Sequence, residues 1–198
     1  MEEVTLTFMP SENAMSTVIA PKLLTAEEFF ALPDDGQRTE LVAGKVVIMN
    51  LPGYRHGRVC NRIGRLIGNF VEERHLGTTL NNDSGIITRR DPDTVRGADV
   101  TFYSYTRIPE SEDPVGYPDA VPEIVFEVVS PSNTRRAITV KTGEYLNAGV
   151  NVVCVVDPAY KTVNLHFPEQ PTKELEGDTA LTFADLPGFS LPVSKFFE

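Results

Sequence analysis

The chain has 198 residues, of which 41% are hydrophobic and 23% charged, a mixture typical of one soluble globular domain with a real core. No apolar run approaches the roughly 20 residues that a membrane-spanning helix needs, and the acidic start lacks the pattern of a signal peptide. The formal net charge of −10 argues against coating nucleic acid by bulk electrostatics, but leaves room for a local basic groove or a carboxylate metal site.

The first part of the chain predicts one short helix and one hairpin. Residues 1–20 show no periodicity, and we expect them to form a flexible lead-in. Thr25 and Glu28 form a capping box, which predicts a helix start. Residues 38–50 are two alternating stretches around Ala43-Gly44, the pattern of a β-hairpin.

The clearest helix is predicted at residues 54–71. Its apolar side chains recur at helical spacing on one arc: Val59, Ile63, Leu66, Ile67 and Phe70. Four arginines recur on a neighbouring stripe: Arg55, Arg58, Arg62 and Arg65. This arginine stripe is either a solvated helix face or a weak nucleic-acid contact. His56 falls on the apolar arc and should point inward or toward its edge.

The rest of the chain alternates strands with one helix. In chain order we expect strands at 85–90 and 98–104, a polar loop at 107–123, a strand at 123–129, a helix at 134–148, and strands at 150–157 and 162–167. The apolar tail should pack back on the body. The two cysteines lack metal-ligand spacing, which favours a reducing cytoplasm. No repeat or linker is visible, so residues 21–198 predict a single α/β domain with a mixed sheet.

Three charged residues stand where the pattern predicts burial. Glu127 interrupts an apolar strand, Asp99 lies in another strand, and Lys141 falls on the inward arc of the following helix. An unpaired charge in a core costs several kcal/mol, so such groups are usually paired, metal-bound or protonated. Two acids and a lysine that converge would suit a divalent cation whose shell is completed by water and a substrate phosphate.

The order of these features resembles the PD-(D/E)XK nuclease superfamily and, within it, a bacterial restriction endonuclease family of uncharacterised function. The resemblance runs from about Leu23 to the C-terminus. It rests on these stretches in order: "TELVAGKVV", "YRHGRVCNRIGRLI", "GADV", "PEIVFEVVSPSN", "KTGEYLNAGV", "VVDP" and "LPGFSLP". It implies a restriction-endonuclease-like fold, an α/β architecture with a central mixed β-sheet flanked by helices.

The resemblance also implies a set of site residues. Asp99 would be the metal-binding aspartate of the "PD" motif and Glu127 the acid of the second motif. The carbonyl of Val128 would be a further metal ligand. The resemblance points as well to His56 and Glu40 as catalytic residues.

Two positions depart from the superfamily pattern. Ala98 precedes the aspartate where the pattern has proline, which matters little because proline supplies no ligand. Position 129 is Val where the pattern has lysine. In the family that this chain resembles, the lysine lies on the next helix, and Lys141 is the matching residue. The inward position of Lys141 on its helix supports this match independently.

The function implied is a metal-dependent endonuclease that hydrolyses phosphodiester bonds of DNA with Mg²⁺ or Mn²⁺, with a homodimer suited to cutting both strands. The alternative is a catalytically weak or inactive nuclease-fold protein with a binding or regulatory role, which the acidic net charge favours. Structural alternatives also stay open. Glu127 could pair with an arginine of the stripe, Glu40 with Lys45 across the hairpin, and Lys141 could extend to solvent.

Overall fold

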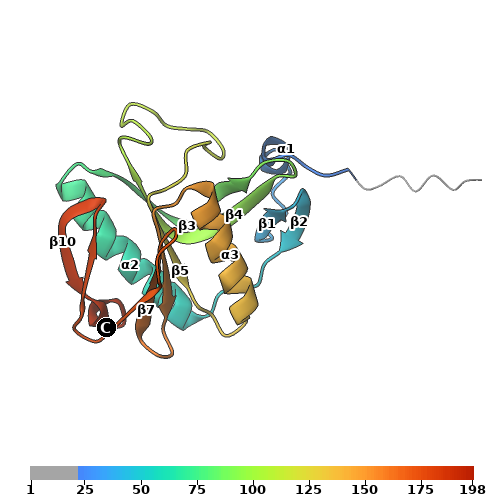
Figure 1. The fold of residues 1–198 in the computed structure, drawn as a ribbon. Coiled ribbons are helices and arrows are strands. Elements are labelled where there is room, and N and C mark those ends of the chain that lie inside the picture. Colours follow the sequence, from blue (N-terminus) through green and yellow to red (C-terminus); the bar gives the residue numbers. More distant parts are fainter. Residues whose placement is uncertain (1–21) are drawn as a thin grey trace, which may run out of the picture.

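The computed structural model of the protein describes residues 22–198, so the expected lead-in at 1–20 lies outside the described residues. An eight-stranded mixed sheet is flanked by helix α2 (Tyr54–Glu73) on one face and helix α3 (Arg135–Ala148) on the other (Figure 1). No helix in this part of the chain is long and apolar enough to cross a membrane.

The remaining elements are short helices and strands. In chain order they are α1 (Ala26–Phe30), β1 (Thr39–Val42), β2 (Lys45–Ile48), β3 (Gly77–Arg89), β4 (Thr94–Ser104), β5 (Ile124–Val128), β6 (Val152–Asp157), β7 (Thr162–His166), β8 (Lys173–Glu176), β9 (Ala180–Phe183), β10 (Leu186–Pro192) and the 3₁₀ helix η1 (Val193–Phe196). Seven strands follow the order β2-β1-β4-β5-β6-β7-β8, and β3 pairs with β4 off this path. Within residues 22–198 only the β5–β6 pair is parallel, and α3 is the crossover that joins these two strands.

Most elements agree with the sequence predictions. The capping box of Thr25 and Glu28 is present in α1. The turn of the β1–β2 hairpin has positive φ at both Ala43 and Gly44, as two-residue hairpin turns require. Strand β3 begins at Gly77, well before the predicted start, because its first half is polar and partly exposed and so lacks an apolar pattern.

Apart from a smaller cluster around α1 and β1, the core has one apolar cluster on each face of the sheet. Side chains of α2 pack against Phe126 and its alternate neighbours on β5, together with the C-terminal β9–β10 hairpin and η1. On the other face Tyr145 of α3 packs against Val125 of β5 and Val153 of β6. Because side chains alternate along a strand, Glu127 follows Val125 on the α3 face. The carboxylate therefore occupies a place in the row of core residues.

A close backbone approach at Gly77 gives a test of the sheet. A Cβ at this position would lie 2.0 Å from the carbonyl oxygen of Tyr103 on β4, so the paired strands would have to separate. Gly77→Ala should lower the free energy of unfolding by about 1–3 kcal/mol in urea denaturation. The control is Gly68→Ala in α2, where the nearest atom would be 4.0 Å away and alanine favours the helix. Equal stability of the two variants would contradict this expectation.

Candidate active site

One edge of β4 changes its partner along its length. The strand pairs with β1 at Val95 and with β5 from Val100 onward. Residues 96–99 lie between these two ladders. Continued by one step, the β4–β5 register would set Asp99 opposite Glu127, but the ladder ends just before that pair. The strands separate here, and the candidate site lies at this separation.

Side chains of the candidate site bind the backbone groups that the separated strands leave open. Gly97 donates its N–H to Glu40 Oε1 at 3.1 Å, and its carbonyl oxygen accepts from Lys141 Nζ at 2.7 Å. Val128 donates its N–H to Asp99 Oδ2 at 2.7 Å. Buried backbone groups must find partners, so these bonds fix the orientation of the three charged side chains.

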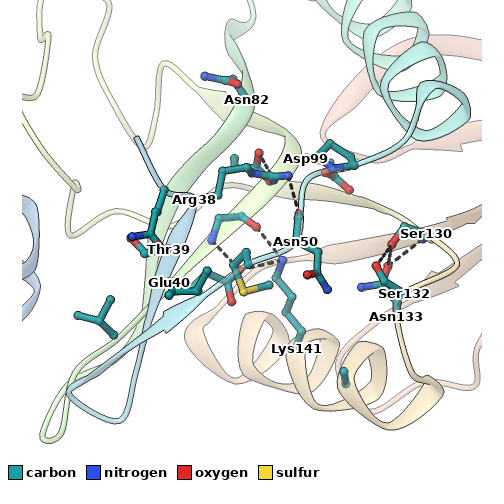
Figure 2. Close-up of a pocket in the computed structure, with 18 of the residues that line it drawn as sticks. Arg38, Thr39, Glu40, Asn50, Asn82, Asp99, Ser130, Ser132, Asn133 and Lys141 are labelled. Carbon is teal, nitrogen blue, oxygen red and sulfur yellow. Dashed lines mark hydrogen bonds and ion pairs between the residues drawn. The ribbon is translucent and has the colours of Figure 1, made fainter. Parts of the chain in front are cut away.

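Lys141 and Glu127 meet, as their sequence positions predict. Lys141 Nζ lies 2.9 Å from Glu127 Oε1 and 3.1 Å from Glu40 Oε1, and only 18% of the lysine side chain is exposed. The lysine therefore reaches inward from α3 rather than extending to solvent (Figure 2). Tyr145, one turn further along α3, donates its hydroxyl to Glu127 Oε1 at 2.8 Å. The partners of Glu127 are thus on α3, and the alternative pairing with the arginine stripe is wrong.

Glu40 belongs to the same buried network. Its Oε2 accepts from Arg96 at 2.8 Å, and Arg96 also binds Glu144 of α3 at 2.6 Å. The cross-strand partner of Glu40 is Val47, so the alternative pairing with Lys45 is wrong. Sequence reasoning missed Arg96, although a charge inside an apolar strand is the signal that singled out Glu127.

His56 approaches the site from α2. Its Nε2 lies 3.2 Å from Asp99 Oδ2, and its Nδ1 lies 3.4 Å from the sulfur of Cys60. Burial lowers the pKa of His56, but the hydrogen bond and charge of Asp99 raise it by more, so the net pKa lies above its usual value. The imidazole and the Asp99 carboxylate therefore hold each other in place.

The two acids and the lysine influence one another's charge. Burial raises the pKa of Glu127 to about 7, and repulsion from Asp99 adds to this, while Lys141 and Tyr145 oppose it. Burial lowers the pKa of Lys141, but attraction by Glu127 and Glu40 outweighs burial and keeps the ammonium charged. The site thus contains a fixed cation beside a carboxyl that ionises near neutral pH.

These groups line a cavity of about 690 Å³. Its walls include all the predicted catalytic and metal-binding residues: Glu40, His56, Asp99, Glu127, Val128 and Lys141. Other polar side chains that were not predicted from the sequence line it as well: Arg38, Asn82, Ser130 and Asn133 (Figure 2), together with Asp83. A bulge in β3 places Asp83 at the cavity, where it forms an ion pair with Arg38.

Comparison with known proteins shows which family the chain belongs to. Residues 26–194 match the model of a family described as "Uma2: Putative restriction endonuclease". The chain belongs to this family. The crystal structure of "a putative nuclease belonging to DUF820" from Anabaena variabilis is similar with a TM-score of 0.76 at 20% sequence identity, covering 88% of this chain and 97% of that one. No curated protein matches the chain.

The Uma2 assignment and the structural likeness confirm the predicted restriction-endonuclease-like fold. Asp99, Glu127 and Lys141 all lie within the residues that match the family. The roles of these residues in this Uma2 protein remain predictions, to which the geometry adds their positions.

The arginine stripe has partners of its own in this Uma2 chain. Arg62 donates to the carbonyl oxygen of Lys195 at 2.8 Å, and Arg58 to that of Phe197 at 3.3 Å. Arg55 and Arg65 are exposed, and the cavity-lining residues include none of these four arginines. Two of the four therefore hold the C-terminal segment, and the nucleic-acid role of the stripe stays a prediction.

The donor chemistry of the cavity fits a divalent cation. Asp99 and Glu127 offer carboxylate oxygens, the hard ligands that Mg²⁺ and Mn²⁺ prefer. Asp99 and Glu127 would form the next pair of the β4–β5 register, and the negative charge of Asp99 raises the pKa of Glu127. A bound cation would relieve the repulsion between the two carboxylates.

Proposed function

We propose that this Uma2 protein is a metal-dependent endonuclease that hydrolyses phosphodiester bonds of DNA, with Mg²⁺ or Mn²⁺ as cofactor. One observation carries the proposal: Asp99, Glu127 and Lys141 line a single cavity where β4 and β5 separate. A nucleophile motif or a phosphate-cradling glycine loop is not needed for this chemistry.

Each charged residue has a distinct role in the proposed reaction. Asp99 and Glu127, with the Val128 carbonyl, would hold the cation, which when bound polarises the phosphate and lowers the pKa of a coordinated water. Lys141, whose three N–H donors meet Gly97, Glu127 and Glu40, offsets by its positive charge the negative charge that develops on the phosphate. Its ammonium is fixed by Glu40 and Glu127, so it needs little reorganisation.

Three further groups support binding of a nucleic acid. Arg38 lines the cavity and supplies a guanidinium suited to phosphate oxygens. Ser130 and Asn133 form the opposite part of the lining, where Ser130 donates to Asn133 Oδ1 and the Asn133 amide nitrogen offers a neutral donor. A homodimer would bring two such sites to the two strands of a duplex. The cysteines are free, which fits the proposed cytoplasmic location.

Cleavage assays with the purified full chain test this proposal. Plasmid, linear and single-stranded DNA should be cut with Mg²⁺ or Mn²⁺ and left intact with EDTA. Lys141→Met should slow cleavage by about 100-fold or more, because an oriented charge near the phosphate is lost. Lys173→Met on the exposed strand β8 is the control and should cut like the wild type. The assays are run below the melting temperature of each variant.

The same assays distinguish a second candidate function. The net charge of −10 favours a nuclease-fold protein that binds or regulates without efficient catalysis. If no form of DNA or RNA is cut and a titration finds no binding of Mg²⁺, this second function replaces the first, whereas saturable binding that is lost in Glu127→Gln supports an active site. Cleavage that persists in EDTA would contradict both.

A further inference from the structure

A second set of metal-ligating side chains adjoins the proposed Mg²⁺ site. His56 and Cys60 are four residues apart in α2, so their side chains lie on the same face of the helix. Asp99 approaches them from β4. One donor atom from each of the three residues lies within 4.8 Å of the others. A thiol, an imidazole and a carboxylate thus converge from two elements of the rigid core.

The separation of His56 Nε2 and Asp99 Oδ2 is close to that of two ligands in a tetrahedral zinc site. Zn–S bonds of about 2.3 Å and Zn–N and Zn–O bonds of about 2.0 Å imply roughly 3.3 Å between nitrogen and oxygen and roughly 3.5 Å between sulfur and nitrogen. His56 Nε2 lies 3.2 Å from Asp99 Oδ2 and 3.9 Å from the sulfur of Cys60. The sulfur lies nearer to Nδ1, at 3.4 Å, so a rotation of the Cys60 side chain must first bring it to the Nε2 side of the ring before it can bind the same ion.

The donor types select a different metal from the one proposed for catalysis. Thiolate and imidazole bind Zn²⁺, whereas Mg²⁺ prefers oxygen ligands. The side chains of His56 and Asp99 are only 11% and 9% exposed, so they are held by their surroundings. Both also line the open cavity, which gives the ion a path and leaves the fourth position to water.

We propose that Cys60, His56 and Asp99 form an inhibitory Zn²⁺ site. Zinc held there takes Asp99, so it excludes the catalytic cation, and the thiol of Cys60 releases its proton to solvent as zinc binds. The zinc site itself rests on the geometry of the three side chains. Inhibition rests additionally on the proposed nuclease function.

Cobalt absorption tests the site without an activity assay. Co²⁺ replaces Zn²⁺ as a probe, added to the full chain under reducing conditions with Mg²⁺ in excess. We expect visible bands of tetrahedral cobalt and a near-ultraviolet thiolate-to-cobalt band, both removed by one equivalent of Zn²⁺. Cys60→Ser should lose the thiolate band and bind Zn²⁺ at least about tenfold more weakly. Cys154→Ala is the matched control, because Cys154 is buried in the core on β6 and should leave the band unchanged.

The outcomes separate the site from the nuclease proposal. Absence of the thiolate band, or its persistence in Cys60→Ser, overturns the zinc site and leaves Cys60 as a packing neighbour of His56. If the band behaves as expected, Zn²⁺ should inhibit wild-type cleavage, and Cys60→Ser should need at least about tenfold more zinc for the same inhibition. Equal sensitivity of the two proteins overturns the inhibitory role. A wild type that cuts no DNA contradicts the nuclease proposal, while the cobalt spectra still decide the metal site.

Discussion

Asp99→Asn is expected to reduce Mg²⁺-dependent DNA cleavage by about 1,000-fold or more while the fold is retained. The substitution removes a carboxylate charge from the proposed cation site, and a 1,000-fold loss corresponds to about 4 kcal/mol of transition-state stabilisation. The amide oxygen of Asn can still accept the N–H of Val128, the bond that joins β4 to β5 at this point. Stability should therefore change much less than activity.

Three measurements on Asp99→Asn check this expectation. Single-turnover cleavage gives the rate, calorimetric titration gives the affinity for Mg²⁺, and thermal unfolding gives the stability. Asp113→Asn, in an exposed loop, is the control and should match the wild type in all three. Cleavage within tenfold of wild type would mean that Asp99 is not a ligand of the catalytic cation.

Glu127→Gln is expected to abolish cleavage and yet stabilise the metal-free protein above neutral pH. The pKa of Glu127 is raised to about 7, chiefly by burial, whereas an unfolded glutamate titrates near about 4.3. The folded chain therefore keeps a proton that the unfolded chain has lost between these two values. Stability from this group is complete below about pH 4.3 and disappears as the pH rises through about 7.

A neutral glutamine removes this pH dependence. In EDTA, Glu127→Gln should equal the wild type near pH 4.5 and exceed it above pH 8 by a free energy of unfolding on the order of 3 kcal/mol. Urea unfolding at both pH values measures the difference. Glu174→Gln, on exposed strand β8, should show no such change with pH. A Glu127→Gln protein that is less stable than the wild type above pH 8 would mean that the ionised carboxylate stabilises the fold, contrary to this expectation.

The pairing of Glu127 with Lys141 was accessible from sequence because two simple patterns point to it. A carboxylate in an apolar strand must find a partner, and helical periodicity places the lysine on the inward face of α3. Arg96 follows the same logic and joins the same network, although it was overlooked. Buried charges are thus readable wherever the surrounding pattern of burial is regular.

Features that depend on irregular backbone or distant partners were not accessible. The bulge in β3 that brings Asp83 to the cavity interrupts the strand period, and no local pattern predicts its ion pair with Arg38. Periodicity groups the arginine stripe correctly on one helix face. It does not reveal that Arg58 and Arg62 bind the C-terminal segment, because that contact is made only in the folded chain.

The partner change along β4 has a mechanical consequence. The β1–β2 hairpin forms one wall of the cavity, yet it joins β4 through the pair at Leu41 and Val95, bonds from its turn, and the charged contacts of Glu40. One of those contacts is the ion pair of Glu40 with Lys141, and Lys141 also binds Glu127. The hairpin wall of the cavity and the Glu127–Lys141 ion pair are therefore thermodynamically linked. A ligand that changes the charge of Glu127 should also change how strongly the β1–β2 hairpin is held on β4. Binding of that ligand and release of the hairpin from β4 would then be coupled.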